Sequence, residues 1–142
     1  MFGRVAGAML AVAAGVSPVA DAARAADPSF ADRVRHADVS RGRDLADSMC
    51  SDCHNFDRDG SAMMGPNLYG LMGTHIAAIA DYNFSPALLA RRQQVWTVET
   101  LSAWLKDPAG FAPGTRMGFD GIVSDRDRAD IVAYLGSLSG GK

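Results

Sequence analysis

The chain has 142 residues, which suits one domain plus an extension. Its formal net charge is -2, so no broad excess of basic side chains points to a nucleic-acid partner. Hydrophobic residues make up 48% of the chain, which is enough for a core, although an Ala-rich N-terminus inflates the figure.

Residues 1–25 are predicted to be a secretory signal peptide that is cleaved. Arg4 supplies a positive start, residues 5–20 carry no charge, and A-x-A patterns follow in residues 20–25. The apolar run of 16 residues is shorter than the ~20 that a spanning helix needs, so a retained membrane anchor is the less favoured alternative. We therefore expect export to the periplasm without stable membrane insertion.

Residues 26–37 are polar and show no sustained period, and they are predicted to form a flexible leader. His36 is expected to be a solvated side chain rather than a metal ligand.

A helix is expected to begin near Asp38. Leu45, Met49 and Cys53 recur at i, i+4 and i+8 and predict one apolar stripe. Gly42 interrupts this pattern, and such a glycine usually marks the approach of another backbone. The partner we expect is a C-terminal helix capped by Ser124, whose apolar face is formed by Ile131, Leu135 and Leu138.

The segment Cys50-Ser51-Asp52-Cys53-His54 is the attachment signature of a c-type haem. Each thiol can add to one vinyl group of the porphyrin, and the imidazole of His54 can bind the iron. A redox C-x-x-C would need a preceding strand, and a zinc site would need further cysteines, but the chain has only two. We expect one covalently bound haem c per chain, which would complete a small core.

The middle of the chain is rich in turns, because Gly60 and the segment 65–70 break any regular element. Ser85 is expected to cap a short helix over residues 86–92. Thr97 is expected to cap a longer helix that Pro108 ends, with Leu101, Trp104 and Leu105 on one face. No β-alternation is present, which predicts an all-α protein with long loops.

The motifs C-S-D-C-H, G-P-N-L-Y-G, W-T-V-E-T-L-S-A-W-L-K-D-P and P-G-T-R-M-G-F-D-G-I occur in this order. In this respect the chain resembles class I cytochromes c, chiefly the mitochondrial type and its soluble bacterial relatives, over residues 38–139. The resemblance implies a cytochrome c domain over residues 38–142. In that fold the N- and C-terminal helices cross, and short helices and long loops wrap around one haem.

The resemblance also implies roles for single residues. His54 and Met117 would be the axial ligands, and the carbonyl of Pro66 would accept the N–H of His54. Trp96 would bind a haem propionate, and Thr115 would lie behind the Met117 loop. Phe119 would shield the haem edge. On composition alone, four other side chains compete with Met117 as ligands: Met63, Met64, Met72 and His75.

Four positions depart from the family pattern. Trp104 replaces a Tyr near the Met sulfur, and Ala46 replaces an aromatic residue at the helix crossing. Thr74 stands where an Arg is common near a propionate. Phe84 stands about where relatives commonly have a propionate-binding Tyr. Tyr82 is close enough in the chain that it could be the matching residue instead, so the register of this loop stays open.

The function expected from the resemblance is one-electron transport by a monomer, not enzymatic catalysis. Its expected partners are redox proteins, such as a cytochrome bc-type complex and a terminal oxidase or reductase. The alternatives are a haem subunit of a larger oxidoreductase and a gas-binding or enzymatic haem protein. Because Lys106 and Lys142 are the only lysines, docking is expected to be apolar, with Met49, Met63 and Phe119 as contacts.

Overall fold

The computed structural model describes Gly3 and residues 27–138, so the predicted signal peptide lies almost wholly outside the described residues. Six helices follow one another along the described chain: α1 (Phe30–Arg35), α2 (Val39–Cys50), α3 (Pro86–Leu89), α4 (Val98–Lys106), α5 (Pro108–Phe111) and α6 (Asp125–Ser137). The pairing between His75 and Val95 is an isolated bridge, and no strand occurs within residues 27–138. The all-α prediction is confirmed.

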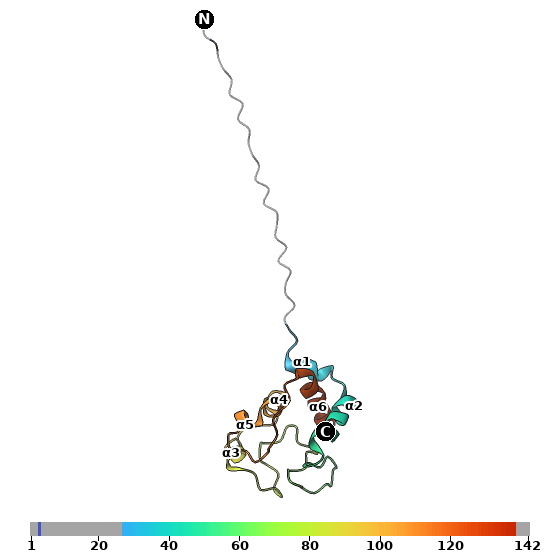
Figure 1. The fold of residues 1–142 in the computed structure, drawn as a ribbon, viewed down its shortest axis with the longest axis vertical. Coiled ribbons are helices and arrows are strands. Elements are labelled where there is room, and N and C mark those ends of the chain that lie inside the picture. The colour runs from blue at the N-terminus through green and yellow to red at the C-terminus, as the bar shows by residue number, and fades with distance from the viewer. Residues whose placement is uncertain (1–2, 4–26, 139–142) are drawn as a thin grey trace.

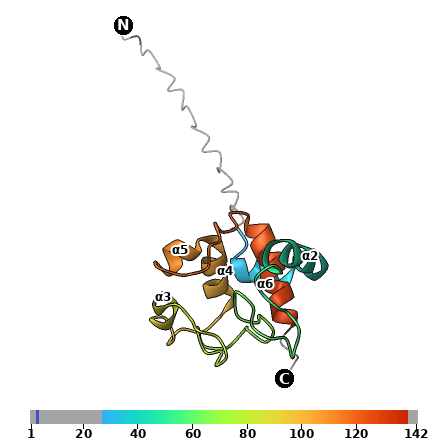
Figure 2. The same cartoon turned by 60° about the horizontal axis from the view of Figure 1, so that its bottom comes forward.

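The helices and the long loops occupy different parts of the molecule. α1, α2, α4 and α6 gather at one end, and the loop between α2 and α3 curves away from them (Figures 1 and 2). None of the helices in the described part of the chain has the length and apolar character needed to cross a bilayer.

The helix starts depend on local hydrogen bonds that the sequence predicts. The side chains of Ser85, Thr97 and Ser124 accept backbone N–H groups in the first turns of α3, α4 and α6. α3 ends at Leu89, three residues before the predicted end, and turns lead onward from there. Pro108 ends α4 and also begins α5, which Asp107 caps.

α2 and α6 pack against each other, as predicted for the two terminal helices. A Cβ atom on Gly42 would lie 2.0 Å from the carbonyl oxygen of Asp130, so only a glycine allows this close approach. The buried residues of α2 are Gly42 and Ala46, whereas Met49 is 44% exposed. The predicted stripe is therefore wrong at its C-terminal end, because the helix stops at Cys50 and Cys53 lies in the following turn.

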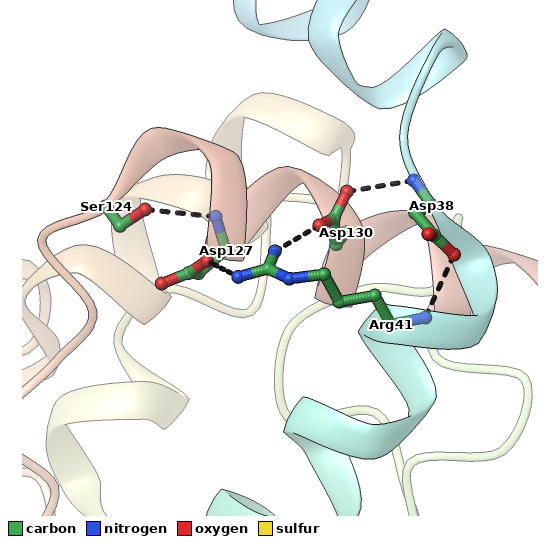
Figure 3. Close-up of polar contacts among 5 residues, drawn as sticks. All are labelled: Asp38, Arg41, Ser124, Asp127 and Asp130. Atoms are coloured by element: carbon green, nitrogen blue, oxygen red, sulfur yellow. Dashed lines mark hydrogen bonds and ion pairs between the residues drawn. The ribbon is translucent and has the colours of Figure 1, made fainter.

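A polar cluster completes this helix contact. The guanidinium of Arg41 on α2 binds the carboxylates of Asp127 and Asp130 on α6 (Figure 3). Asp130 is buried and also accepts the backbone N–H of Asp38 at 2.9 Å.

The predicted flexible leader contains α1, which packs against α6 and α4. Ser29 and Asp32 form a reciprocal capping box that supplies the local start signal. Phe30 and Val34, spaced at i and i+4, pack against the core. His36 is exposed at the end of the helix, as expected.

Candidate functional site

The two cysteines and His54 lie together because α2 ends in a tight turn. The backbone N–H groups of Cys53 and His54 both donate to the carbonyl of Cys50, at 3.0 and 2.9 Å. Both cysteines are free and half-buried. Burial raises the pKa of the Cys50 thiol to about 11, with a smaller contribution from Cys53. A redox-active cysteine has a lowered pKa, so the raised pKa of Cys50 does not favour a redox-active thiolate there.

The imidazole of His54 is fixed by the loop that follows it. Its Nδ1 lies 2.7 Å from the carbonyl oxygen of Pro66, and because a carbonyl only accepts, Nδ1 carries the proton. Nε2 is thereby left with the lone pair that a metal ion requires. Burial lowers the pKa of His54, which favours the neutral, ligating form of the ring.

Gly65 determines how closely this loop approaches the ring. A Cβ atom at this position would lie 2.3 Å from Cε1 of His54. The backbone N–H of Gly65 also donates to the carbonyl of Cys53 at 2.8 Å. The sequence marks Gly65 only as a turn residue, because its contact with the imidazole arises from tertiary structure.

Asn67 was also missed as a functional residue. Its side-chain amide donates to the carbonyls of Asp57 and Gly60, both at 2.7 Å, and its Oδ1 accepts the N–H of Tyr69. An Asn in a Gly-Pro-Asn segment is a recognisable turn signal, but its partners cannot be read from spacing.

A cavity of about 710 Å³ lies against the cysteine turn. Its volume is within the ~300–1,000 Å³ that is usual for small-molecule and cofactor sites. Seven side chains singled out from the sequence as site residues line it, from elements far apart in the chain: Cys50, Cys53, His54, Pro66, Trp96, Thr115 and Met117. The sequence prediction therefore selected residues that the fold brings together.

Met117 reaches the cavity from the loop after α5. Its backbone N–H donates to Oγ1 of Thr115 at 3.2 Å, and its side chain packs against the core. The guanidinium of Arg116 binds the carbonyl of Asn83, which ties this loop to the segment before α3. Phe119 also lines the cavity.

The competing ligands differ in their positions. Met64 and His75 line the cavity, but Met64 is 74% exposed and His75 is also exposed. Met63 and Met72 do not line it. Within residues 27–138, no group of three or more His, Cys, Asp or Glu side chains is arranged to hold a metal ion.

The departures from the family pattern lie on the cavity wall. Trp96 and Trp104 are buried there with ring centroids 6.0 Å apart, and Phe111 packs against both. Phe84 is buried in the wall and Tyr82 packs edge-on against it. The hydroxyl of Tyr82 donates to the carbonyl of Met64, at 2.8 Å, so it joins the loops on two sides of the cavity.

These features fit a haem. The wall is mainly apolar, two thiols stand on one side, and an imidazole with a free lone pair stands beside them. Cys50 and Cys53 would hold the group covalently, and His54 would bind its iron. Trp96 could donate a hydrogen bond to a propionate of the haem, and Thr115 already accepts one from the backbone of Met117.

Comparison with known proteins leads to the same family. A family model described as Cytochrome c matches residues 39–139. The chain is 40% identical to a "Cytochrome c homolog" of Bradyrhizobium diazoefficiens, over 83% of this chain and 64% of the relative. It is 40% identical to a homolog of Rickettsia felis over 72% of this chain and 57% of the relative. A "Cytochrome c" of Theileria parva is 39% identical over 75% of this chain and 90% of the relative.

The chain spans 64% and 57% of the lengths of the first two relatives, so the likeness is to a domain within those proteins. The family model nevertheless covers most of the described residues. The chain belongs to the cytochrome c family, and its Cys50-Ser51-Asp52-Cys53-His54 motif accordingly implies a covalently bound haem c.

Proposed function

We propose that the mature protein is a periplasmic one-electron carrier with a haem c that His54 and Met117 ligate. One observation carries this proposal: both side chains line the same cavity as the two cysteines. The haem would supply a ferrous–ferric couple, and a thioether ligand raises its potential. With both axial positions occupied by the protein, no open iron position would remain for a substrate.

The remaining residues would keep the surroundings and the ligands of the haem the same in the ferrous and the ferric state. The carbonyl of Pro66 holds the tautomer of His54 and makes the imidazole a stronger donor. The apolar wall excludes water from the site. The hydrogen bond from the N–H of Met117 to Thr115 limits the movement of the Met117 loop.

The partners we propose are redox proteins, such as a cytochrome bc-type complex and a terminal oxidase or reductase. Residues 61–90, which supply much of the cavity wall, contain one charged side chain, Asp81. Met49 and Met64 line the cavity and are exposed, and Met63 beside them is half exposed. This pattern supports a small, apolar and short-lived contact. Export rests on the signal peptide predicted for residues 1–25, which would leave the leader and the domain in the periplasm.

Optical spectra of the purified protein, with and without reductant, test the cofactor and its ligation together. Acid-acetone should leave the porphyrin on the polypeptide. Met117→Ala should open the sixth position, allow CO to bind the ferrous protein and lower the potential. Met64→Ala is the matched control, because Met64 also lines the cavity but is largely exposed.

The outcomes separate the alternatives. If Met64→Ala rather than Met117→Ala admits CO, the ligand assignment is wrong. A wild-type protein that binds CO readily at neutral pH would instead favour a gas-binding or enzymatic haem protein. Purification only within a larger complex would favour a fixed haem subunit.

A further inference from the structure

We infer that Phe30 on α1 is a positioning residue for the Met117 loop and acts through the buried Arg128. The inference rests on the proposed ligation by Met117. α1 (Phe30–Arg35) precedes residues 39–139, which the family model matches.

Arg128 joins three parts of the molecule. It is 3% exposed, and its Nε donates to Oγ of Ser102 on α4 at 3.2 Å. One terminal nitrogen donates to the carbonyls of Ile122 and Val123, the latter at 2.7 Å, and the other binds Asp125. Four hydrogen bonds thus use most of the five N–H groups that a guanidinium offers.

The segment that Arg128 binds, Ile122 and Val123, follows Met117 closely in the chain. The N–H of Ile122 donates to the carbonyl of Leu105 at 2.8 Å. At Gly121, with φ of +98°, a Cβ atom would lie 2.2 Å from the carbonyl oxygen of Lys106. The chain is therefore fixed against α4 four and five residues after Met117, and Arg128 binds the carbonyls of Ile122 and Val123 in the same segment.

Phe30 covers this connection from outside. Its ring lies over Arg128, with 5.8 Å between the guanidinium carbon and the ring centroid. The capping box of α1 and the packing of α1 on α6 and α4 hold the ring there. A cation over an aromatic face is stabilised, and hydrogen bonds shielded from water are stronger than exposed ones. Removing the ring would admit water to Arg128 and loosen residues 121–123.

The test uses the haem-loaded protein and three variants. Phe30→Ala removes the ring, and Phe30→Tyr keeps an aromatic face. Leu45→Ala removes packing from α2, at a residue that does not line the cavity and makes none of the hydrogen bonds of Arg128. Two quantities are measured: amide hydrogen exchange of residues 118–124, and the affinity of the ferric protein for added imidazole, which competes with Met117 for the iron.

In Phe30→Ala, residues 118–124 should exchange faster and imidazole should bind about three- to tenfold more tightly. Phe30→Tyr should restore both values. Leu45→Ala should lower the melting temperature and leave both values near those of the wild type.

Unchanged exchange and unchanged imidazole affinity in Phe30→Ala would overturn the inference. Equal changes in Leu45→Ala would also overturn it, because they would reflect general destabilisation. If the wild type binds imidazole as readily as Met117→Ala, the proposed ligand set fails instead. Hydrogen exchange does not depend on that ligand set and would still decide whether Phe30 fixes residues 118–124.

Discussion

Two neighbouring residues determine the position of the His54 imidazole, Pro66 by a hydrogen bond and Gly65 by the absence of a side chain. The carbonyl of Pro66 fixes the protonated nitrogen, and Gly65 leaves room for the ring itself. Pro66 therefore acts on the imidazole through a polar contact, and Gly65 acts on it through the space that it leaves.

The Gly65 contact predicts the effect of Gly65→Ala. A methyl group 2.3 Å from Cε1 would overlap the ring, so either the imidazole or the loop must move. Overpacking of this kind typically costs ~1–3 kcal/mol, and here it would also displace the proposed iron ligand, His54. We expect less haem-loaded protein and a high-spin component in its spectrum. Wild-type yield together with an unchanged low-spin spectrum would contradict this.

At the scale of elements, the contact between α2 and α6 depends on close backbone approach. The two helices contain one glycine each within their spans, Gly42 and Gly136, and these differ in their surroundings. A Cβ atom on Gly42 would overlap the backbone of Asp130, whereas one on Gly136 would meet nothing within 4 Å.

The two glycines predict opposite effects of alanine. Gly42→Ala should destabilise the protein by ~1–3 kcal/mol or more, because the helices must separate. Gly136→Ala should stabilise it by up to ~1 kcal/mol, because alanine is the better helix former. Urea unfolding of the haem-loaded variants measures both. Equal effects of the two substitutions would show that helix propensity outweighs packing here.

The Arg41 cluster makes the α2–α6 contact sensitive to pH. A hydrogen bond from Arg41, aided by its charge, lowers the pKa of Asp127 below the ordinary Asp value of about 3.9. The native state therefore binds fewer protons than the unfolded state at acid pH. The stabilising effect is complete well above pH ~4 and is lost as the pH falls through and below that value.

Asp127→Asn should lower stability near pH 7, and its difference from the wild type should shrink as the pH falls from about 5 to 3. Unfolding by urea at several pH values measures this difference. Asp44→Asn is the control, since Asp44 is exposed and lies outside the cluster. A difference for Asp127→Asn that stays constant across this pH range would contradict the proposed ion pair.

At the scale of the whole molecule, the ion pairs of the described residues are confined to a few helices. These ion pairs join α2 to α6 or lie within α1, α2 or α6, whereas residues 61–90 contain one charged side chain, Asp81. Charge steering raises association rates and weakens with salt, so a contact through the uncharged region should depend little on salt.

Electron-transfer rates to the native partner should therefore fall only slightly between low and physiological ionic strength. Stopped-flow kinetics at several salt concentrations measure this, and Met63→Ser should lower the rate at every ionic strength. A steep fall with salt would show instead that charges steer docking, with Arg91 and Arg92 as the first residues to substitute.

Much of this architecture follows from short-range sequence features. Ser85, Thr97 and Ser124 cap their helices because each oxygen bonds an N–H only three residues later. The cysteine turn and its histidine likewise depend on neighbours in the chain. Contacts between near neighbours in the chain can be recognised from the sequence, and the motifs at larger spacing identified the family.

Other features depend on residues far apart in the sequence. α1 carries a capping box that local inspection could find, but Phe30 gains its contact from Arg128, 98 positions later. Gly65 meets His54, and Gly42 meets Asp130, through space. The sequence by itself determined the haem motif, the starts of α2, α3, α4 and α6, and the family. Only the tertiary structure decided which glycines and which face of α2 are buried, because burial depends on the element that packs opposite.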